Sequence, residues 1–364
     1  MSPAVDTPHA RQRKSTPSII AELLKGSWRP SPPVLNLNEE ELARVVPQLK
    51  GSGTAALAWW RMRGSRLRDT AAGEELRRAY QTQTLQSALQ EREVGHVCAR
   101  LRAAGVEPIL LKGLGAARLY AERGLRPAGD IDLCVRPEQY EDARRAVWGP
   151  GAKGGAPVDL KHDDSALLTR DGWDGLYARS VLLDLDGTRV RVPGGEDHLR
   201  FLCLHLLRHS AYRPLWLCDV AAALESAPEE FDWDVAVGCD ALRRNWVGCV
   251  LDLARRLLGA TREALPEFVC GTRAPAWLLT EVLRQWERPT TADHEPRELM
   301  AVSLRNPLRA LPALVGRWPD PVRALVGLNL PFDERARLPR QLKFYVVQSA
   351  AFLKRPLRPL KKED

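Results

Sequence analysis

Apolar residues recur at helical spacing through most of the chain and change to strand spacing in only a few short segments. From Ala71 to Ala104 they return every three to five positions with charges between them, which predicts one long helix ending before Gly105. Further helices are predicted at about 19–24, 38–49, 55–68, 114–122, 137–147, 196–209, 214–225, 233–258, 275–287 and 340–353, with short proline-punctuated segments at 299–314 and 321–328.

Strand-like segments cluster in one part of the chain. Apolar runs at 109–111, 131–135 and 158–160 are short enough for strands, and Asp186-Gly187 predicts a hairpin turn between 181–185 and 190–192. The order predicts an α+β fold with a small mixed sheet flanked by helices and with helical N- and C-terminal regions. We expect four regions: 1–70, helical after a disordered start; 71–194, the core with its long leading helix; 195–290, helical; and 291–364, a helical extension with a basic tail.

Composition adds little to this picture. The formal charge of +8 and pI near 9.3 are compatible with nucleic-acid binding, but the basic residues are scattered along the chain, which favours a general arginine bias. The seven cysteines form no C-x-x-C pair and lie mainly in apolar runs, so we expect buried, reduced thiols. Without a signal-peptide pattern or an apolar run long enough to span a membrane, the sequence predicts a cytoplasmic protein.

A pair of aspartates carries the first chemical signal. Asp130 and Asp132 alternate with Ile131 and Leu133 in a predicted strand, and side chains two apart share one face. Two carboxylates side by side repel each other unless a cation lies between them. A hard divalent ion such as Mg²⁺, or Mn²⁺ in its place, takes oxygen ligands and keeps positions for substrate phosphates.

The end of the strand 109–111 carries a second signal. Lys112 and Gly113 stand where that strand gives way to a predicted helix. Glycine allows close backbone approach, a helix N-terminus offers unpaired N–H groups, and a lysine supplies a positive charge that suits phosphate. The alternative, in which Lys112 only pairs with a nearby carboxylate, stays open.

Taken together, Leu-Lys-Gly at a strand end, a helix, and then Arg-Pro-x-x-Asp-Ile-Asp-Leu resemble the nucleotidyltransferase superfamily typified by DNA polymerase beta. More narrowly, they resemble its uncharacterised bacterial nucleotidyltransferase-like family, over about residues 71–219. The resemblance implies a core that binds a nucleoside triphosphate (NTP) at a glycine turn and two metal ions at an Asp-x-Asp pair. Two features differ from the usual pattern: Leu114 follows Gly113 in place of Ser or Gly, and Gly113 stands farther from Asp130 along the chain.

Carried onto this sequence, the resemblance makes Gly113 the phosphate-turn glycine and Asp130 and Asp132 metal ligands. Because the turn departs from the usual pattern, we expect phosphate binding to depend on Lys112, whose positive charge suits a phosphate. The resemblance also implies a third carboxylate on a neighbouring strand, which would bind metal and deprotonate an acceptor hydroxyl. Asp159 is our choice, because it follows the Asp-Ile-Asp strand by one helix and a loop and because the family resemblance places a Val-Asp-Leu strand there. Asp184 on the next strand is the second candidate, and Asp186 is better explained as a turn residue.

Several other polar residues have a functional and a structural interpretation. Arg126 precedes the Asp-Ile-Asp strand and is a further candidate phosphate contact. His205 and His209 have the i, i+4 spacing of a metal pair, although core packing explains at least one of them better. Asp219 lies in an apolar helix, where it either pairs with an arginine such as Arg208 or Arg213 or positions the active site. His162 is better explained as a loop residue. The basic tail is better explained as solvated, and its other interpretation is contact with a membrane surface or an acidic partner.

We therefore predict a metal-dependent nucleotidyltransferase that moves a nucleoside monophosphate from an NTP to a small-molecule or protein acceptor. Its metal and catalytic residues are Asp130, Asp132 and Asp159, and its nucleotide contacts are Lys112, Gly113 and Arg126. The alternative is a catalytically degenerate scaffold or antitoxin-like protein that binds nucleotide without turnover. Convergence of the three carboxylates is the structural requirement of the enzyme.

Overall fold

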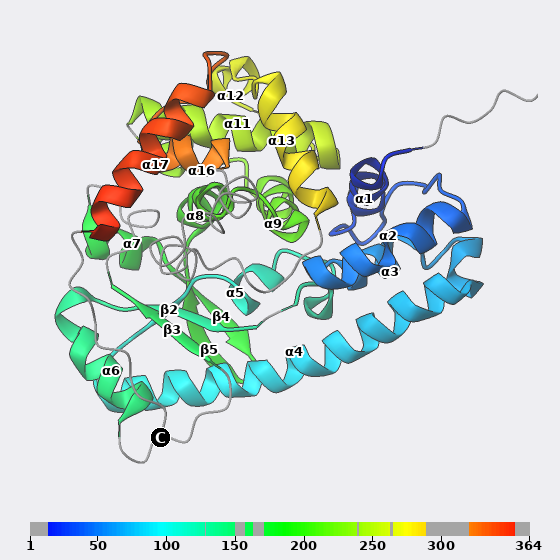
Figure 1. The fold of residues 1–364 in the computed structure, drawn as a ribbon. Helices are drawn as coiled ribbons and strands as arrows, with labels where there is room; N and C mark the ends of the chain where they lie inside the picture. The colour runs from blue at the N-terminus through cyan, green and yellow to red at the C-terminus, as the bar shows by residue number, and fades with distance from the viewer. Residues whose placement is uncertain are drawn as a thin grey trace, which may run out of the picture.

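The computed structural model of the chain describes residues 14–127, 129–149, 157–162, 171–238, 240–262, 265–288 and 320–353. Within them a mixed sheet of five strands is surrounded by helices, so the predicted α+β fold is confirmed (Figure 1). Some predicted features lie outside these ranges: the first 13 residues, most of the loop 149–157, the segments 290–296 and 299–314, Cys239 and the tail 354–362.

Three helices open the described chain: α1 (Thr16–Leu24), α2 (Glu39–Ser52) and α3 (Ala55–Met62). Asn38 caps α2: its side chain accepts from the Glu41 backbone N–H, and the Glu41 carboxylate accepts from the Asn38 N–H. A short 3₁₀ helix, η1 (Arg66–Asp69), follows α3, so the helix predicted over 55–68 is interrupted.

The predicted long helix is confirmed as α4 (Ala71–Ala103), and Gly105 follows its end in the left-handed conformation at φ 75°. α4 runs along one side of the sheet (Figure 1). Its second half packs against that side together with α6 (Tyr140–Trp148), which follows the 3₁₀ helix η3 (Pro137–Gln139).

The sheet has the order β3-β2-β1-β5-β4 and mixes parallel and antiparallel neighbours. β2 pairs with β3, and β1 with β5, in parallel, while β1–β2 and β4–β5 are antiparallel. The predicted hairpin turn is confirmed, since Asp186 and Gly187 have φ of 49° and 79°, as a type I′ turn requires. The strands are β1 (Ile109–Leu110), β2 (Ile131–Cys134), β3 (Val158–Lys161), β4 (Val181–Leu185) and β5 (Thr188–Val192).

The two faces of the sheet meet different layers. Ile131 and Leu133 belong to the apolar cluster formed with α4 and α6, whereas Cys134 belongs to the cluster of the helical region. Because side chains alternate along a strand, Asp132 is on the same face as Cys134. The polar side chains of β2 are therefore on the face that meets the helical layer.

Helices after residue 170 form that layer, above the sheet in Figure 1. They bury apolar side chains against one another and against α1–α3, and this cluster includes Trp216, Trp246 and Trp286. The helices are α7 (Gly172–Arg179), α8 (Gly195–Arg208), α9 (Pro214–Glu225), α10 (Trp233–Val237), α11 (Ala241–Leu258), α12 (Glu267–Gly271), α13 (Ala276–Glu287), α16 (Pro321–Gly327) and α17 (Leu338–Leu353).

Two further predicted helices differ from the structure. The helix expected at 114–122 is wrong beyond its first turn: α5 covers only Leu114–Ala117, because the Ala121 N–H bonds to the Trp28 carbonyl instead of continuing the helix. The helix expected at 233–258 is two helices, since Gly238 at φ 73° ends α10 and Asp240 caps α11. In the part of the chain that is described, no helix is long and apolar enough to cross a membrane.

Candidate active site

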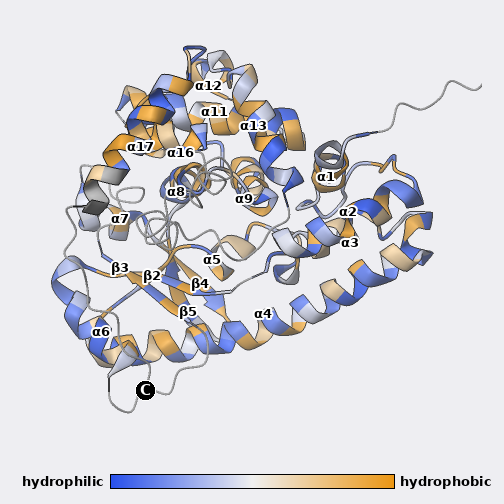
Figure 2. Cartoon of the chain, viewed as in Figure 1, coloured by the Kyte–Doolittle hydropathy of each residue, from blue (hydrophilic) through white to orange (hydrophobic). Residues whose placement is uncertain are grey.

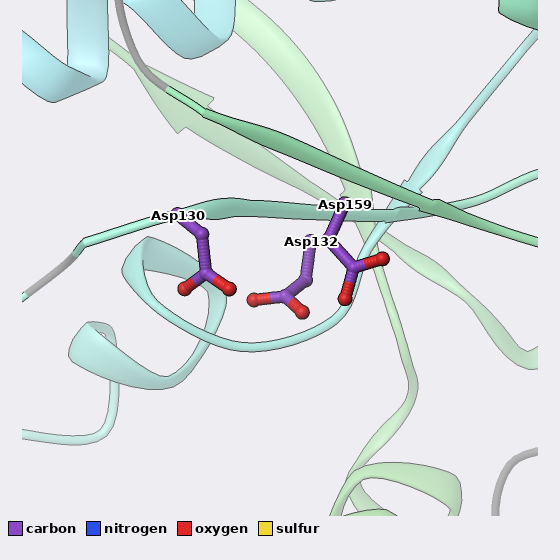
Figure 3. Close-up of side chains that lie close together, drawn as sticks. All are labelled: Asp130, Asp132 and Asp159. Atoms are coloured by element: carbon purple, nitrogen blue, oxygen red, sulfur yellow. The ribbon is translucent and has the colours of Figure 1, made fainter. Parts of the chain in front are cut away.

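Three carboxylates come together at the edge of the sheet. Asp132 on β2 is the register partner of Asp159 on the parallel strand β3, and Asp130 immediately precedes β2. Figure 3 shows the three side chains on one side of these strands. One oxygen from each lies within 4.8 Å of the others, a spacing that suits ligation of a metal ion. The structure thus brings Asp159 to the Asp130–Asp132 pair.

Asp132 is the buried member of this cluster. Its side chain has no exposed surface, whereas those of Asp130 and Asp159 are about half exposed. Burial raises the pKa of Asp132, Lys112 and Lys161 counteract the rise, and the charge of Asp130 adds to it. Its Oδ1 meets two ammonium groups, while Oδ2 is buried and has no hydrogen-bond partner among the described residues. A buried oxygen without a hydrogen-bond partner costs about 1–3 kcal/mol of stability, and a bound cation would remove that cost.

Lys112 follows β1, the neighbour of β2 on the side away from β3, and contacts the cluster from there. Its Nζ lies 3.0 Å from Asp132 Oδ1 and 3.6 Å from Asp130 Oδ2. Gly113 makes this possible with φ 64° and ψ −119°, the first central position of a type II′ turn, closed by the Gly115 N–H on the Lys112 carbonyl at 3.2 Å. Only glycine adopts this conformation readily, so the turn accounts for the glycine at position 113.

Lys161 is the site residue that the sequence reasoning missed. Its Nζ lies 3.1 Å from Asp132 Oδ1 and 3.0 Å from Asp159 Oδ2. Burial acts to lower the pKa of Lys161, but the charges of Asp132 and Asp159 outweigh it and the pKa lies above its usual value. The signal was present in the alternation Val158-Asp159-Leu160-Lys161, because residues two apart on a strand share a face.

Arg126 lies in the core. Its Nη2 and Nε contact Asp219 Oδ2 and Oδ1 at 2.9 and 3.1 Å, and its Nη1 donates to the Pro127 carbonyl. The Tyr120 hydroxyl donates to Asp219 Oδ1 at 2.6 Å. The predicted phosphate contact of Arg126 stays a prediction, while the observed bonds join the approach to Asp130 to α9. Asp219 thus pairs with Arg126, not with Arg208 or Arg213, the partners that the sequence suggested.

The loop between η2 (Arg123–Leu125) and β2 is also held from α4. The Gln83 side chain donates to the Gly124 carbonyl at 2.7 Å, and the Gln90 side chain donates to the Gly129 carbonyl at 2.8 Å. Gly124, Arg126 and Gly129 are therefore held by α4 and α9 just before the first aspartate of the cluster.

The other candidate carboxylate and histidines do not belong to the carboxylate cluster. Asp184 is on β4, at the opposite edge of the sheet from β3, and its carboxylate caps the turn by accepting from the Gly187 N–H. His162 packs on Tyr140 with ring centroids 4.4 Å apart. His205 and His209 contact each other and Trp216, and burial together with the positive charge of Lys112 lowers the pKa of both imidazoles, that of His209 to about 4.

The residues of the cluster fit a divalent cation. Asp130, Asp132 and Asp159 offer hard oxygen ligands, and the unpartnered Oδ2 of Asp132 is a buried acceptor that an ion would satisfy. The two lysines leave the five charged groups with a net charge of −1. A cavity of about 490 Å³ between α13, α16 and α17 includes none of these side chains in its lining. The candidate metal ligands and the two lysines therefore lie at the sheet edge and not in that cavity.

Comparison with known proteins agrees with this geometry. A family model described as an uncharacterised nucleotidyltransferase matches residues 38–259, from the cap of α2 to the end of α11. No curated protein and no solved structure matches the chain. The match includes the glycine turn, the three carboxylates and Asp219, and it extends beyond residues 71–219 on both sides. The chain belongs to this family of uncharacterised nucleotidyltransferases.

Proposed function

We propose that the protein is a metal-dependent nucleotidyltransferase that transfers a nucleoside monophosphate from an NTP to an acceptor hydroxyl. The observation that carries the proposal is the convergence of Asp130, Asp132 and Asp159, in which one buried carboxylate oxygen has no partner among the described residues. Acceptors with a phosphate or carboxyl oxygen fit the same chemistry, and the acceptor is a small molecule or a protein. The cysteines of the described residues are mainly buried thiols, which agrees with a cytoplasmic location.

Each side chain has a role that follows from its position. Asp130, Asp132 and Asp159 would hold Mg²⁺ or Mn²⁺, which when bound neutralises phosphate charge and polarises the phosphorus that is attacked. Lys112, at the Gly113 turn, contacts phosphate oxygens of the NTP. Lys161 is placed to neutralise charge between Asp132 and Asp159. Arg126, bound to Asp219, positions the loop that leads into Asp130.

The reaction balances with these groups. The acceptor oxygen forms a bond to the α-phosphorus, and the bond from that phosphorus to the oxygen bridging the β-phosphate breaks. The electron pair leaves with pyrophosphate, and the hydroxyl proton passes to Asp159, whose carboxylate is half exposed and returns the proton to solvent. The products are the acceptor carrying a nucleoside monophosphate, and pyrophosphate.

Pyrophosphate release from a panel of NTPs in the presence of Mg²⁺ tests the proposal. We expect release with at least one NTP, its loss on chelation of the metal, and a fall of at least about 100-fold in Asp132→Asn and in Asp130→Ala, because both remove a proposed ligand. Asp186→Asn is the matched control, since asparagine also tolerates the left-handed turn position and Asp186 lies in the distant hairpin.

A second candidate function is a nucleotide-binding scaffold or antitoxin-like protein without turnover. The observation that favours it is Lys161, whose ammonium group already neutralises Asp132 and Asp159 as an ion would. Calorimetric titration with Mg²⁺ separates the two. The enzyme binds Mg²⁺, and more tightly in Lys161→Gln, because a competing positive charge is gone. NTP binding without Mg²⁺ binding and without pyrophosphate release across the panel would establish the scaffold.

A further inference from the structure

Lys161 bridges two of the three carboxylates of the cluster. Its Nζ lies 3.1 Å from Asp132 Oδ1 and 3.0 Å from Asp159 Oδ2, so the ammonium group donates a hydrogen bond to each. In a site with two metal ions, about 3.5–4 Å apart, a bridge between neighbouring carboxylates is made by an ion. The ammonium group of Lys161 therefore fills the space between Asp132 and Asp159 in which one of two ions would lie.

The sheet fixes Lys161 in that position. It lies on β3 as the register partner of Cys134 on β2, and its carbonyl accepts from the Val135 N–H at 2.9 Å. Its side chain is on the same face of β3 as that of Asp159, two positions earlier. Figure 2 shows hydrophilic positions among hydrophobic ones on these two strands. Because the backbone of Lys161 is part of the sheet, only its side-chain torsions can move the ammonium group away from the carboxylates.

Lys112 is bound less closely to its second carboxylate. Its Nζ lies 3.0 Å from Asp132 Oδ1 but 3.6 Å from Asp130 Oδ2, which is beyond hydrogen-bond distance. Asp130 is half exposed, and Asp132 Oδ2 is buried with no hydrogen-bond partner among the described residues. The Asp130 side of the cluster thus keeps carboxylate oxygens for an ion, whereas Lys161 takes those between Asp132 and Asp159.

The charge of the cluster agrees with one ion. Three carboxylates with two divalent ions carry a net charge of +1, and three carboxylates with two ammonium groups and one divalent ion carry the same charge. A second divalent ion beside both lysines would raise the charge to +3, and the groups would repel one another at close range. The two lysines therefore supply the charge that a second ion would bring.

We propose that Lys161 takes the position of a second metal ion, so that the cluster binds one divalent ion, on the Asp130 side, and not two. This inference rests on the proposed function and narrows it, because the family resemblance implied two ions. Lys161 is a positioning residue, which holds Asp132 and Asp159 together without metal.

The number of Mn²⁺ ions bound to the full chain tests the inference. The protein is equilibrated with Mn²⁺ and an NTP analogue whose α–β bridge is a methylene group, so that no transfer occurs. Equilibrium dialysis counts the bound ions, and electron paramagnetic resonance reports whether they are close together. We expect one Mn²⁺ per chain with the spectrum of an isolated ion.

Lys161→Met removes the ammonium group and keeps a side chain of similar length. We expect this variant to bind two Mn²⁺ per chain, with the spin-coupled spectrum of ions about 3.5–4 Å apart. Lys161→Arg, which keeps a positive charge, should bind one. Circular dichroism checks that each variant is folded, and Lys161→Gln replaces Lys161→Met if the latter is unfolded.

Lys112→Met is the matched control, because it removes the other ammonium group that contacts Asp132. It should bind one Mn²⁺, since Lys161 still fills its position. A rise to two ions in this control would show that the total charge, and not the position of Lys161, limits the number of ions.

Other results would also overturn the inference: two ions in the parent or in Lys161→Arg, or one ion in the folded variant without the ammonium group. The proposed function can fail separately, since one bound ion without pyrophosphate release from any NTP would contradict transfer and leave the ion count standing. No bound Mn²⁺ in the parent would overturn both.

Discussion

His198 on α8 is a buried imidazole whose surroundings oppose its charge. Burial and the nearby guanidinium groups of Arg118 and Arg126 lower its pKa to about 3. Its Nδ1 lies 3.4 Å from Arg118 Nη2, and a hydrogen bond with the Leu111 backbone offsets the lowering of the pKa only in part. The ring is therefore neutral in the folded protein throughout the ordinary pH range.

We predict that the free energy of unfolding falls as the pH is lowered from 6.5 toward 3, with His198 contributing about 1.4 kcal/mol per pH unit. The sign follows from proton binding: below pH 6.5 the unfolded chain takes up a proton on this residue, and the folded chain takes it up only near pH 3. Chemical denaturation at several pH values measures the slope, and His198→Gln should reduce it.

Comparing the parent with His198→Gln at each pH isolates the contribution of His198 to the slope, because the other buried titratable groups are present in both proteins. Asp320 acts in the opposite direction: burial and Glu281 raise its pKa to about 7, so its contribution to stability falls as the pH rises from about 4 to 7. An identical slope in the parent and in His198→Gln would show that His198 is protonated in the folded protein.

At the scale of elements, α4 does more than cover the sheet. With 33 residues it is about 50 Å long, and residues seven apart are on the same face after two turns. Gln83 and Gln90 use that face to hold Gly124 and Gly129, at the two ends of the loop before Asp130. The helix that leads into the core thus also positions the strand that carries the aspartates.

Removing either glutamine should loosen this loop. We expect Gln83→Ala and Gln90→Ala each to cost about 1–2 kcal/mol of stability, because a loop carbonyl loses its donor. Gln90→Ala should also lower kcat for pyrophosphate release more than Gln83→Ala, since Gly129 adjoins Asp130. Denaturation curves and steady-state kinetics measure the two effects.

Gln86→Ala is the matched control, because Gln86 is an exposed glutamine of the same helix. If Gln86→Ala loses as much stability as Gln90→Ala, the loss comes from helix propensity and not from the missing hydrogen bond. Unchanged kcat in Gln90→Ala would remove the link between the loop and catalysis.

Elements defined by local interactions were predictable, and those defined by distant contacts were not. Asn38 and Glu41 form their capping box within one turn, and Asp186-Gly187 forms its hairpin turn from neighbouring residues. The helix expected over 114–122 ends early because Ala121 bonds to Trp28, and no local pattern contains that contact. Gly238 and Asp240 divide the helix expected over 233–258. They are local signals of a helix end and a helix start, but the apolar periodicity led to the prediction of a single helix.

At the scale of the whole molecule, one buried ion pair ties the sheet core to the helical layer. Arg126 precedes β2, Asp219 lies in α9, and both are almost completely buried. Removing one partner of such a pair leaves a buried charge without compensation. The pair therefore couples the approach to the carboxylates to the packing of the helices.

We predict that Asp219→Ala lowers the free energy of unfolding by about 3–5 kcal/mol, because Arg126 is left buried and Tyr120 loses its acceptor. Asp174→Ala should cost less than about 1 kcal/mol, since its ion pair with Arg136 is exposed. Urea unfolding followed by fluorescence measures both. Equal, small losses in the two variants would mean that the buried pair does not join the two parts.

The local sequence pattern alone predicted about half of the residues of the candidate site. Alternation placed Asp130 and Asp132 on one face, and Gly113 marked the turn that presents Lys112, because strand geometry and a glycine-dependent turn depend only on neighbouring residues. The choice of Asp159 over Asp184 rested on chain order, one helix and a loop after the Asp-Ile-Asp strand, and on a family resemblance. In the fold it follows from strand order, which puts β3 beside β2 and β4 at the far edge. Lys161 beside Asp132, and Arg126 as the partner of Asp219, likewise depend on segments far apart in the chain that meet only when the sheet and the helical layer pack.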